Sequence, residues 1–123
     1  MKFKEPHMEA QFLSRPLRLL EVCKEFEDLS EAFGIEPVVT RVTDPVEGES
    51  GVHPAGRAVD FRDEHDGVLM YTDAQTAAIV EYLNKKFERG DGKPVCLHHS
   101  FQGGQYHWHL QTPIEWGKGD NHA

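Results

Sequence analysis

The sequence is poor in cysteine and in long apolar runs. Its two cysteines, Cys23 and Cys96, are too few and too far apart for a disulfide framework or a C-x-x-C metal or redox motif, so we expect two reduced, buried thiols. No segment approaches the roughly 18 apolar residues of a membrane span. The first sixteen residues contain acidic side chains and a proline, which is unlike a signal peptide. We therefore expect no membrane insertion and a protein that is cytoplasmic as synthesised.

Clusters of basic residues and internal repeats are also absent. The 123 residues include 13 Lys and Arg against 21 Asp and Glu, a formal net charge of -8. This balance argues against nucleic acid or an anionic membrane as a partner held by a broad basic surface. Hydrophobic residues make up 38% of the chain, enough for a core. The length predicts one domain over residues 1–123, with residues 117–123 as a flexible tail.

The apolar pattern predicts two helices and five strands. Apolar residues at three- and four-residue steps predict a helix over residues 16–33: Leu17, Leu20, Cys23, Phe26, Leu29 and Phe33. Thr72-x-x-Gln75 is a capping box that begins a second helix, which Gly90 closes. Segments 37–43, 57–62, 68–71, 94–98 and 105–111 are bounded by Gly, Pro or Asp and predict strands. This order predicts an α+β fold, a small, largely antiparallel sheet with helices packed on one face.

Eight histidines raise the possibility of a metal site. Three are expected to be solvated in a terminus or a charged turn: His7, His65 and His122. His53 is followed by a Pro-Ala-Gly turn, and Asp60 lies in the strand beyond it, on the side opposite Val59 and Phe61. Asp60 is thus a candidate metal ligand, although it could equally pair with an arginine or hold a turn amide.

The segment QYHWHLQ strengthens the metal interpretation. His107 and His109 are two residues apart on a predicted strand, so both side chains leave the same face. Imidazole nitrogens and a carboxylate are suitable ligands for Zn²⁺, and three protein ligands leave the fourth position open, as in catalytic sites. His53, Asp60 and one of the two strand histidines would form such a site. The other would accept a proton or stabilise an oxyanion beside it.

Further polar side chains are candidates for roles around this site. A glycine-rich connection suggests that the strand ending at His98 and His99 forms a hairpin with the His107 strand, so that one of the two points toward the metal face. That histidine could bind a ligand side chain or the substrate, and the other could be a surface residue. Arg41 and Arg57 could each hold a substrate carboxylate or make an ordinary surface ion pair.

The histidine and aspartate pattern resembles a known family. Ser50-x-x-His53-x-x-Gly56-x-Ala58-x-Asp60, followed by His107-x-His109, resembles the signature of zinc D-Ala-D-Ala peptidases. That group shares its fold with the Hedgehog signalling domain, penicillin-insensitive murein endopeptidases and lysostaphin-type enzymes. The resemblance implies this fold over most of the chain. It also implies zinc bound by His53, Asp60 and His109, with Arg41 in contact with the substrate.

The implied activity is hydrolysis of a peptide bond in peptidoglycan stem peptides or cross-links. D-Ala-D-Ala peptidases place a catalytic glutamate three residues before the last ligand, where this chain has Tyr106. The H-x-H form instead resembles the murein endopeptidase and lysostaphin branches, which implies a catalytic role for His107. A small chain of this kind resembles phage endolysins, which reach the cell wall after release.

Two other functions stay open from the sequence. The first is a zinc-binding structural or interaction domain that has lost turnover, which the missing glutamate favours. The second is a zinc hydrolase acting on a small amide or ordinary peptide inside the cell, which the acidic net charge favours.

Overall fold

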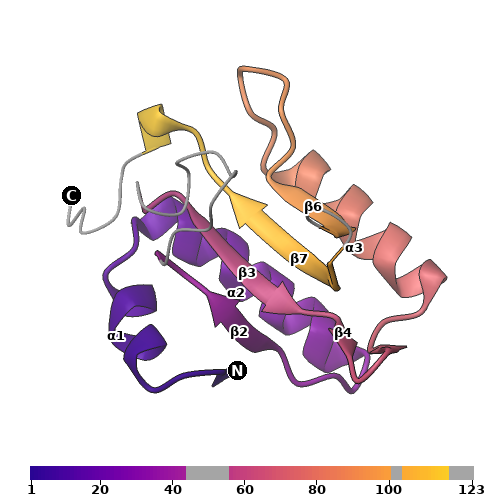
Figure 1. Ribbon diagram of the computed structural model, residues 1–123. Helices are drawn as coiled ribbons and strands as arrows, with labels where there is room; N and C mark the ends of the chain where they lie inside the picture. Colours follow the sequence, from indigo (N-terminus) through magenta and orange to yellow (C-terminus); the bar gives the residue numbers. More distant parts are fainter. Residues whose placement is uncertain (44–55, 101–103, 117–123) are drawn as a thin grey trace.

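The computed structural model describes residues 1–43, 56–100 and 104–116, and it has the α+β organisation that the sequence predicts (Figure 1). Its main element is a mixed five-stranded sheet with strand order β1-β2-β3-β7-β6. The elements in chain order are β1 (Lys2–Phe3), α1 (His7–Leu13), α2 (Leu17–Ala32), β2 (Val38–Arg41), β3 (Ala58–Arg62), β4 (Glu64–His65), β5 (Val68–Leu69), α3 (Asp73–Lys86), β6 (Cys96–Ser100), β7 (Tyr106–Gln111) and the 3-10 helix η1 (Ile114–Trp116).

The sheet is antiparallel from β2 to β6, and only the short β1 pairs in parallel, with β2. Phe26 of α2 packs against Phe61 of β3 and Trp108 of β7, with ring centroids 4.7 and 5.2 Å apart. α2 and α3 lie together on this side of the sheet (Figure 1). We call it the helical face, and the side that carries Asp60 and His109 the polar face. The predicted α+β class and the largely antiparallel pairing are thus confirmed, and α2 and α3 share one face of the sheet.

The first long helix is predicted well in extent and less well in orientation. α2 ends at Ala32, and Gly34 follows with a φ of +78°, which favours glycine. Its fully buried apolar residues are Leu19, Val22, Cys23 and Phe26. Two residues of the predicted stripe lie at its edge, because Leu17 is 59% and Phe33 39% exposed. The buried side is therefore rotated toward Leu19 and Val22.

The predicted capping box is confirmed at the start of α3. The Gln75 amide donates to Thr72 Oγ1 at 3.1 Å, and the Thr72 amide donates to Gln75 Oε1 at 2.9 Å. Ile79 and Leu83 are fully buried against the sheet. The helix ends at Lys86, four residues before the predicted Gly90. Among the described segments, no helix is long and apolar enough to cross a membrane.

The predicted strand over residues 68–71 is wrong in both length and partner. Only Val68 and Leu69 are extended, and they pair with β4 in a separate two-stranded hairpin. Asp66 and Gly67 both have positive φ, +52° and +79°, as a tight two-residue hairpin turn requires. The turn pairs this segment with β4, which is itself outside the five-stranded sheet.

Candidate metal centre

The strand register brings a row of polar side chains together on the polar face. Across β3 and β7, Asp60 lies opposite His109 and Arg62 lies opposite His107. Across β6 and β7, His99 lies opposite His107. Residues opposite one another in antiparallel strands project to the same face, so these side chains share one region. The predicted common face of Asp60, His107 and His109 is confirmed.

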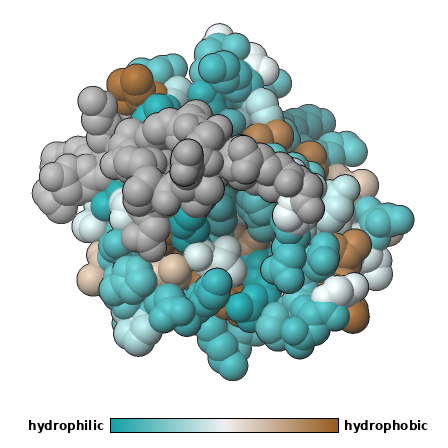
Figure 2. Space-filling view, viewed as in Figure 1, coloured by the Kyte–Doolittle hydropathy of each residue, from teal (hydrophilic) through white to brown (hydrophobic). Residues whose placement is uncertain are grey.

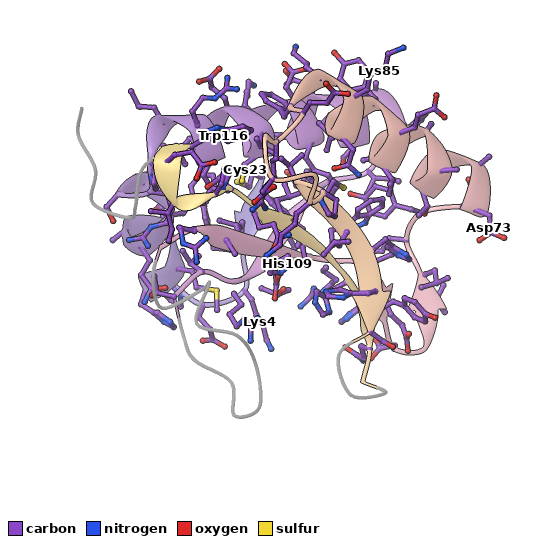
Figure 3. The ribbon with its side chains drawn as sticks, turned by 90° about the horizontal axis from the view of Figure 1, so that it is seen from above. Lys4, Cys23, Asp73, Lys85, His109 and Trp116 are labelled. Atoms are coloured by element: carbon purple, nitrogen blue, oxygen red, sulfur yellow. The ribbon has the colours of Figure 1, made fainter. Side chains whose placement is uncertain are left out.

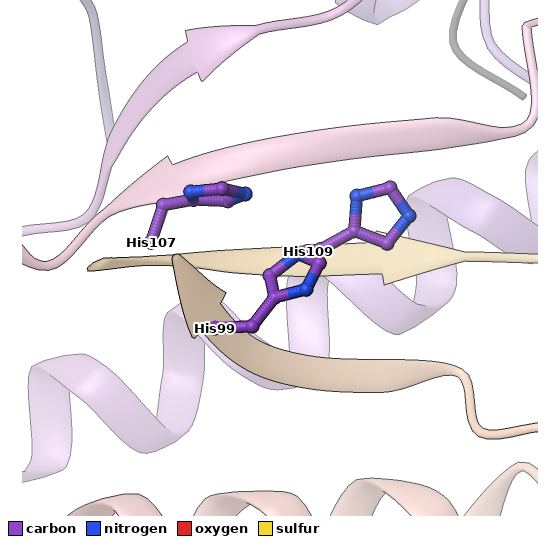
Figure 4. Close-up of side chains that lie close together, drawn as sticks. All are labelled: His99, His107 and His109. Carbon is purple, nitrogen blue, oxygen red and sulfur yellow. The ribbon is translucent and has the colours of Figure 1, made fainter. Parts of the chain in front are cut away.

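Three histidines converge in this region and could bind a metal ion. Each of His99, His107 and His109 offers a ring nitrogen, and these nitrogens all lie within 4.8 Å of one another. The ring centroid of His99 is 4.7 Å from that of His107 and 5.6 Å from that of His109 (Figure 4). Of the two adjacent histidines on β6, His99 is therefore the one that faces the candidate site.

Asp60 lies at the centre of the site and is only 5% exposed. Its Oδ1 is 2.8 Å from Nδ1 of His109, and its Oδ2 is 3.2 Å from Nη2 of Arg41. Oδ2 is also 3.7 Å from Nε2 of His107. The sequence left open whether Asp60 pairs with an arginine, and the structure contains this ion pair. Arg41 thereby compensates the charge of the buried carboxylate. A carboxylate bound to one ring nitrogen orients a histidine for a metal at the other.

The donor set fits a divalent transition metal. Imidazole nitrogens and a carboxylate are common zinc ligands. Nε2 of His107 is buried and has no hydrogen-bond partner among the described residues. A buried polar atom without a partner costs free energy, which a nearby cation or a proton-donating ligand would offset. Nε2 of His109 is 3.0 Å from Oε1 of Gln111, an amide oxygen that coordination would displace.

A cavity of about 510 Å³ lies beside this group and is lined by Arg41, Asp60 and His107, among others. The described part of the surface on this side is mostly hydrophilic (Figure 2). Arg41 thus combines its ion pair to Asp60 with a position at the cavity wall. The position is compatible with the predicted contact between Arg41 and a substrate.

Two predicted residues lie away from the candidate site. His98 projects to the helical face, where Nε2 contacts Oδ2 of the fully buried Asp63 and the ring stacks on Tyr106 at 5.3 Å. It is neither a contact of the metal group nor a surface residue. Arg57 donates from Nη1 to the carbonyl oxygen of Thr112 at 3.2 Å and does not line the cavity. Alternation along a strand explains His98, because neighbouring residues face opposite sides.

The same alternation explains the position of Tyr106. It is three residues from His109, so a regular strand places the two side chains on opposite faces. Ser50 and His53 lie outside the described residues, as does the predicted tail at residues 117–123. The structure therefore brings together Arg41, Asp60, His99, His107 and His109 of the predicted set.

The sequence assigned no site role to three charged residues that line the cavity, Lys4, Arg62 and Glu64. Arg62 could have been found, because it is two residues beyond Asp60 on the same strand and shares its face. Lys4 follows the two-residue strand β1, which is too short to leave a pattern in the sequence. Glu64 belongs to a charged segment that resembles an ordinary surface turn.

Comparisons of the chain with protein-family models, with curated proteins and with solved structures gave no match.

Proposed function

We propose that the protein is a zinc-dependent metallopeptidase that hydrolyses a peptide bond in peptidoglycan stem peptides or cross-links. One observation carries the proposal. His109 contacts the buried Asp60 at 2.8 Å, and the buried Nε2 of His107, which has no hydrogen-bond partner among the described residues, lies 3.7 Å from Asp60 beside a cavity of about 510 Å³. Such a group is suited to hold one divalent cation and leave room for a substrate.

In this proposal, His53, Asp60 and His109 hold the zinc ion. A bound zinc ion would polarise a substrate carbonyl and make a water molecule acidic enough to attack it. Asp60 and His109 are already adjacent, with Oδ1 of Asp60 2.8 Å from Nδ1 of His109, so two of the proposed ligands lie side by side. Arg41 pairs with Asp60 at 3.2 Å in turn, which compensates the charge of the buried carboxylate and fixes its orientation.

His107 accepts the proton that the attacking water loses. Its Nε2 is buried, lacks a hydrogen-bond partner among the described residues and lies 3.7 Å from Asp60 Oδ2. A carboxylate at this distance stabilises the imidazolium that forms. His107 can then return the proton to the leaving amine, as general acid–base catalysis requires. The ring of His99 packs against that of His107, with the ring centroids 4.7 Å apart.

The choice of a peptide substrate rests on the family resemblance of Ser50 to Asp60 and of His107-x-His109. One element of that signature has a physical reason in this chain. Gly56 has a φ of +77°, a conformation that favours glycine, at the turn that leads into the strand of Asp60. The glycine of the signature therefore occupies a backbone conformation that other residues rarely adopt.

A second candidate is a metal-binding domain without catalytic turnover. The three-histidine group favours it, because a metal held by His99, His107 and His109 would use His107 as a ligand. His107 would then no longer be free to accept a proton.

The variant His107→Ala separates the two candidates. The proposed peptidase keeps about one zinc per chain in this variant and loses at least about 100-fold in the rate of peptidoglycan digestion, since general acid–base catalysis contributes on that order. Released fragments are identified by mass spectrometry, and wild-type digestion must create a new amino terminus on a stem peptide. Loss of zinc from His107→Ala would support the non-catalytic domain. Intact peptidoglycan after incubation with zinc-loaded wild type would contradict the proposed peptidase.

A further inference from the structure

The cavity beside the candidate metal centre has a charge balance unlike that of the whole chain. Three cations line it, Lys4, Arg41 and Arg62, against two carboxylates, Asp60 and Glu64. The whole chain instead carries a net charge of -8. Cationic side chains therefore outnumber carboxylates around this cavity, although acidic residues dominate the sequence.

The charged residues that line the cavity differ in whether they form an ion pair or hydrogen bond with another residue. Arg41 is paired with Asp60 at 3.2 Å, and Glu64 accepts a hydrogen bond from the Tyr106 amide at 3.3 Å. Arg62 is half-buried, and its guanidinium makes no ion pair or hydrogen bond with the described part of the chain. A partly buried guanidinium has lost part of its hydration, so an anionic partner stabilises it.

The register places Arg62 close to the site of chemistry. Arg62 lies directly opposite His107 across β3 and β7, and both project to the polar face. Lys4 is exposed at the same cavity. Figure 3 shows Lys4 on the side of His109 and Lys85 on the far side, among the helices. An anion bound by Arg62 would thus lie next to His107, with Lys4 adding a second positive charge.

We propose that Arg62, supported by Lys4, binds a carboxylate of the substrate next to the bond that is cleaved. The inference deepens the proposed function and rests on it for the identity of the substrate as a peptide. It corrects the sequence expectation for Arg57, which is bound to Thr112 and does not line the cavity. A guanidinium and a carboxylate are both planar and can form two parallel hydrogen bonds, so Arg62 would also fix the orientation of the substrate carboxylate.

Binding of two matched probes to the full-length, zinc-loaded protein tests the inference without requiring turnover. One probe is N-acetyl-alanyl-alanine with a free carboxylate, and the other is the same dipeptide as its carboxamide. Each is titrated up to roughly 20 mM, the range for weak small ligands. NMR signals of the His107 ring report binding. We expect the carboxylate to bind about tenfold more tightly than the amide, as for a charge-assisted contact. Arg62→Gln should abolish this preference, and Arg62→Lys should keep part of it.

The control is Lys85→Gln, which removes one positive charge from α3 away from the cavity and should leave the preference unchanged. Thermal unfolding of each variant shows whether it is folded. Equal affinity for the two probes, no binding of either, or an undiminished preference in folded Arg62→Gln would overturn the inference. If Arg62→Gln unfolds, Arg62→Lys and Lys4→Gln decide the outcome, since both should weaken carboxylate binding by at least about threefold. Failure of the peptidase proposal is separate, because it shows as intact peptidoglycan and leaves the probe preference measurable.

Discussion

Asp60 connects three functional side chains through its two carboxylate oxygens. One oxygen contacts His109, and the other pairs with Arg41 and approaches His107. A carboxylate that is 5% exposed is stable only with such partners. Asp60 therefore supports the fold of the polar face and the candidate metal centre through the same contacts.

We predict that Asp60→Ala abolishes metal binding and also destabilises the metal-free protein by about 3 kcal/mol, because the ion pair between Arg41 and the buried Asp60 is lost. Elemental analysis measures the metal, and urea unfolding with a chelator measures the stability. Asp28→Ala removes the same charge from the exposed side of α2 and should change neither quantity appreciably. Metal content and stability at the wild-type level in Asp60→Ala would contradict the assigned position of this carboxylate.

Residue alternation made part of the candidate site predictable. The two-residue spacing predicted that His107 and His109 share a face, and the spacing around Asp60 predicted that it faces away from Phe61. The choice between His98 and His99 needed the register of β6 against β7, because a slip of one residue exchanges the two faces. The buried Asp63 also escaped prediction, since it begins a run of charged residues that is typical of a solvated turn.

The hairpin of β4 and β5 is held to the body of the protein by Asp63. This carboxylate is fully buried, and its Oδ1 accepts from the amides of Met70 at 2.8 Å and Tyr71 at 3.1 Å. Its Oδ2 contacts His98 on β6. These contacts join the hairpin, the start of α3 and the edge of the sheet.

We predict that Asp63→Ala lowers the free energy of unfolding by about 3 kcal/mol, because the Tyr71 amide and His98 lose their carboxylate acceptor and the Met70 amide keeps only the backbone carbonyl of residue 63. Urea unfolding measures the loss, and hydrogen exchange should locate the weakened region at residues 64–72. Asp66→Asn, in the exposed turn of the same hairpin, is the control and should have little effect, since asparagine tolerates positive φ. A change below about 0.5 kcal/mol in Asp63→Ala would show that Asp63 does not hold the hairpin.

Element length decided which parts of the fold could be predicted. α2 and α3 have 16 and 14 residues and present an apolar side over several turns. β1 has two residues and α1 has seven, and α1 has no capping side chain, so neither leaves a clear periodic signal. The parallel pairing of β1 with β2 depends on contacts between distant segments that no local pattern encodes.

The molecule as a whole separates an apolar core on the helical face from a polar face with ionisable groups. Three weakly acidic side chains lie in the core, Cys23, Cys96 and Tyr71. Burial raises the pKa of the Cys23 thiol well above its usual value and that of the Cys96 thiol from 9.0 to about 12. Burial also raises the pKa of Tyr71 from 10.0 to about 12.

These shifts predict a loss of stability in alkali. A raised pKa in the folded state means that the unfolded chain loses these protons at lower pH than the folded chain does. The stabilisation of the folded state by these protonated groups is therefore complete below pH 9 and disappears between pH 9 and about 12. Urea midpoints should be level from pH 8 to about 9 and should fall from there to pH 11.5, and Tyr71→Phe should reduce the slope above pH 10. A constant midpoint over this range would contradict the burial of these groups in the folded protein.

Zinc content is the measurement that tests the central claim most directly. We predict about one zinc ion per chain in the purified protein, as measured by elemental analysis, and none in His109→Ala. The control is His98→Ala, which removes a histidine of β6 that lies on the helical face, and it should retain the metal. Loss of zinc in His109→Ala alone would then reflect the loss of a metal ligand and not of any histidine. A wild-type protein that takes up no zinc, or a His109→Ala variant that keeps it, would contradict the metal centre on the polar face.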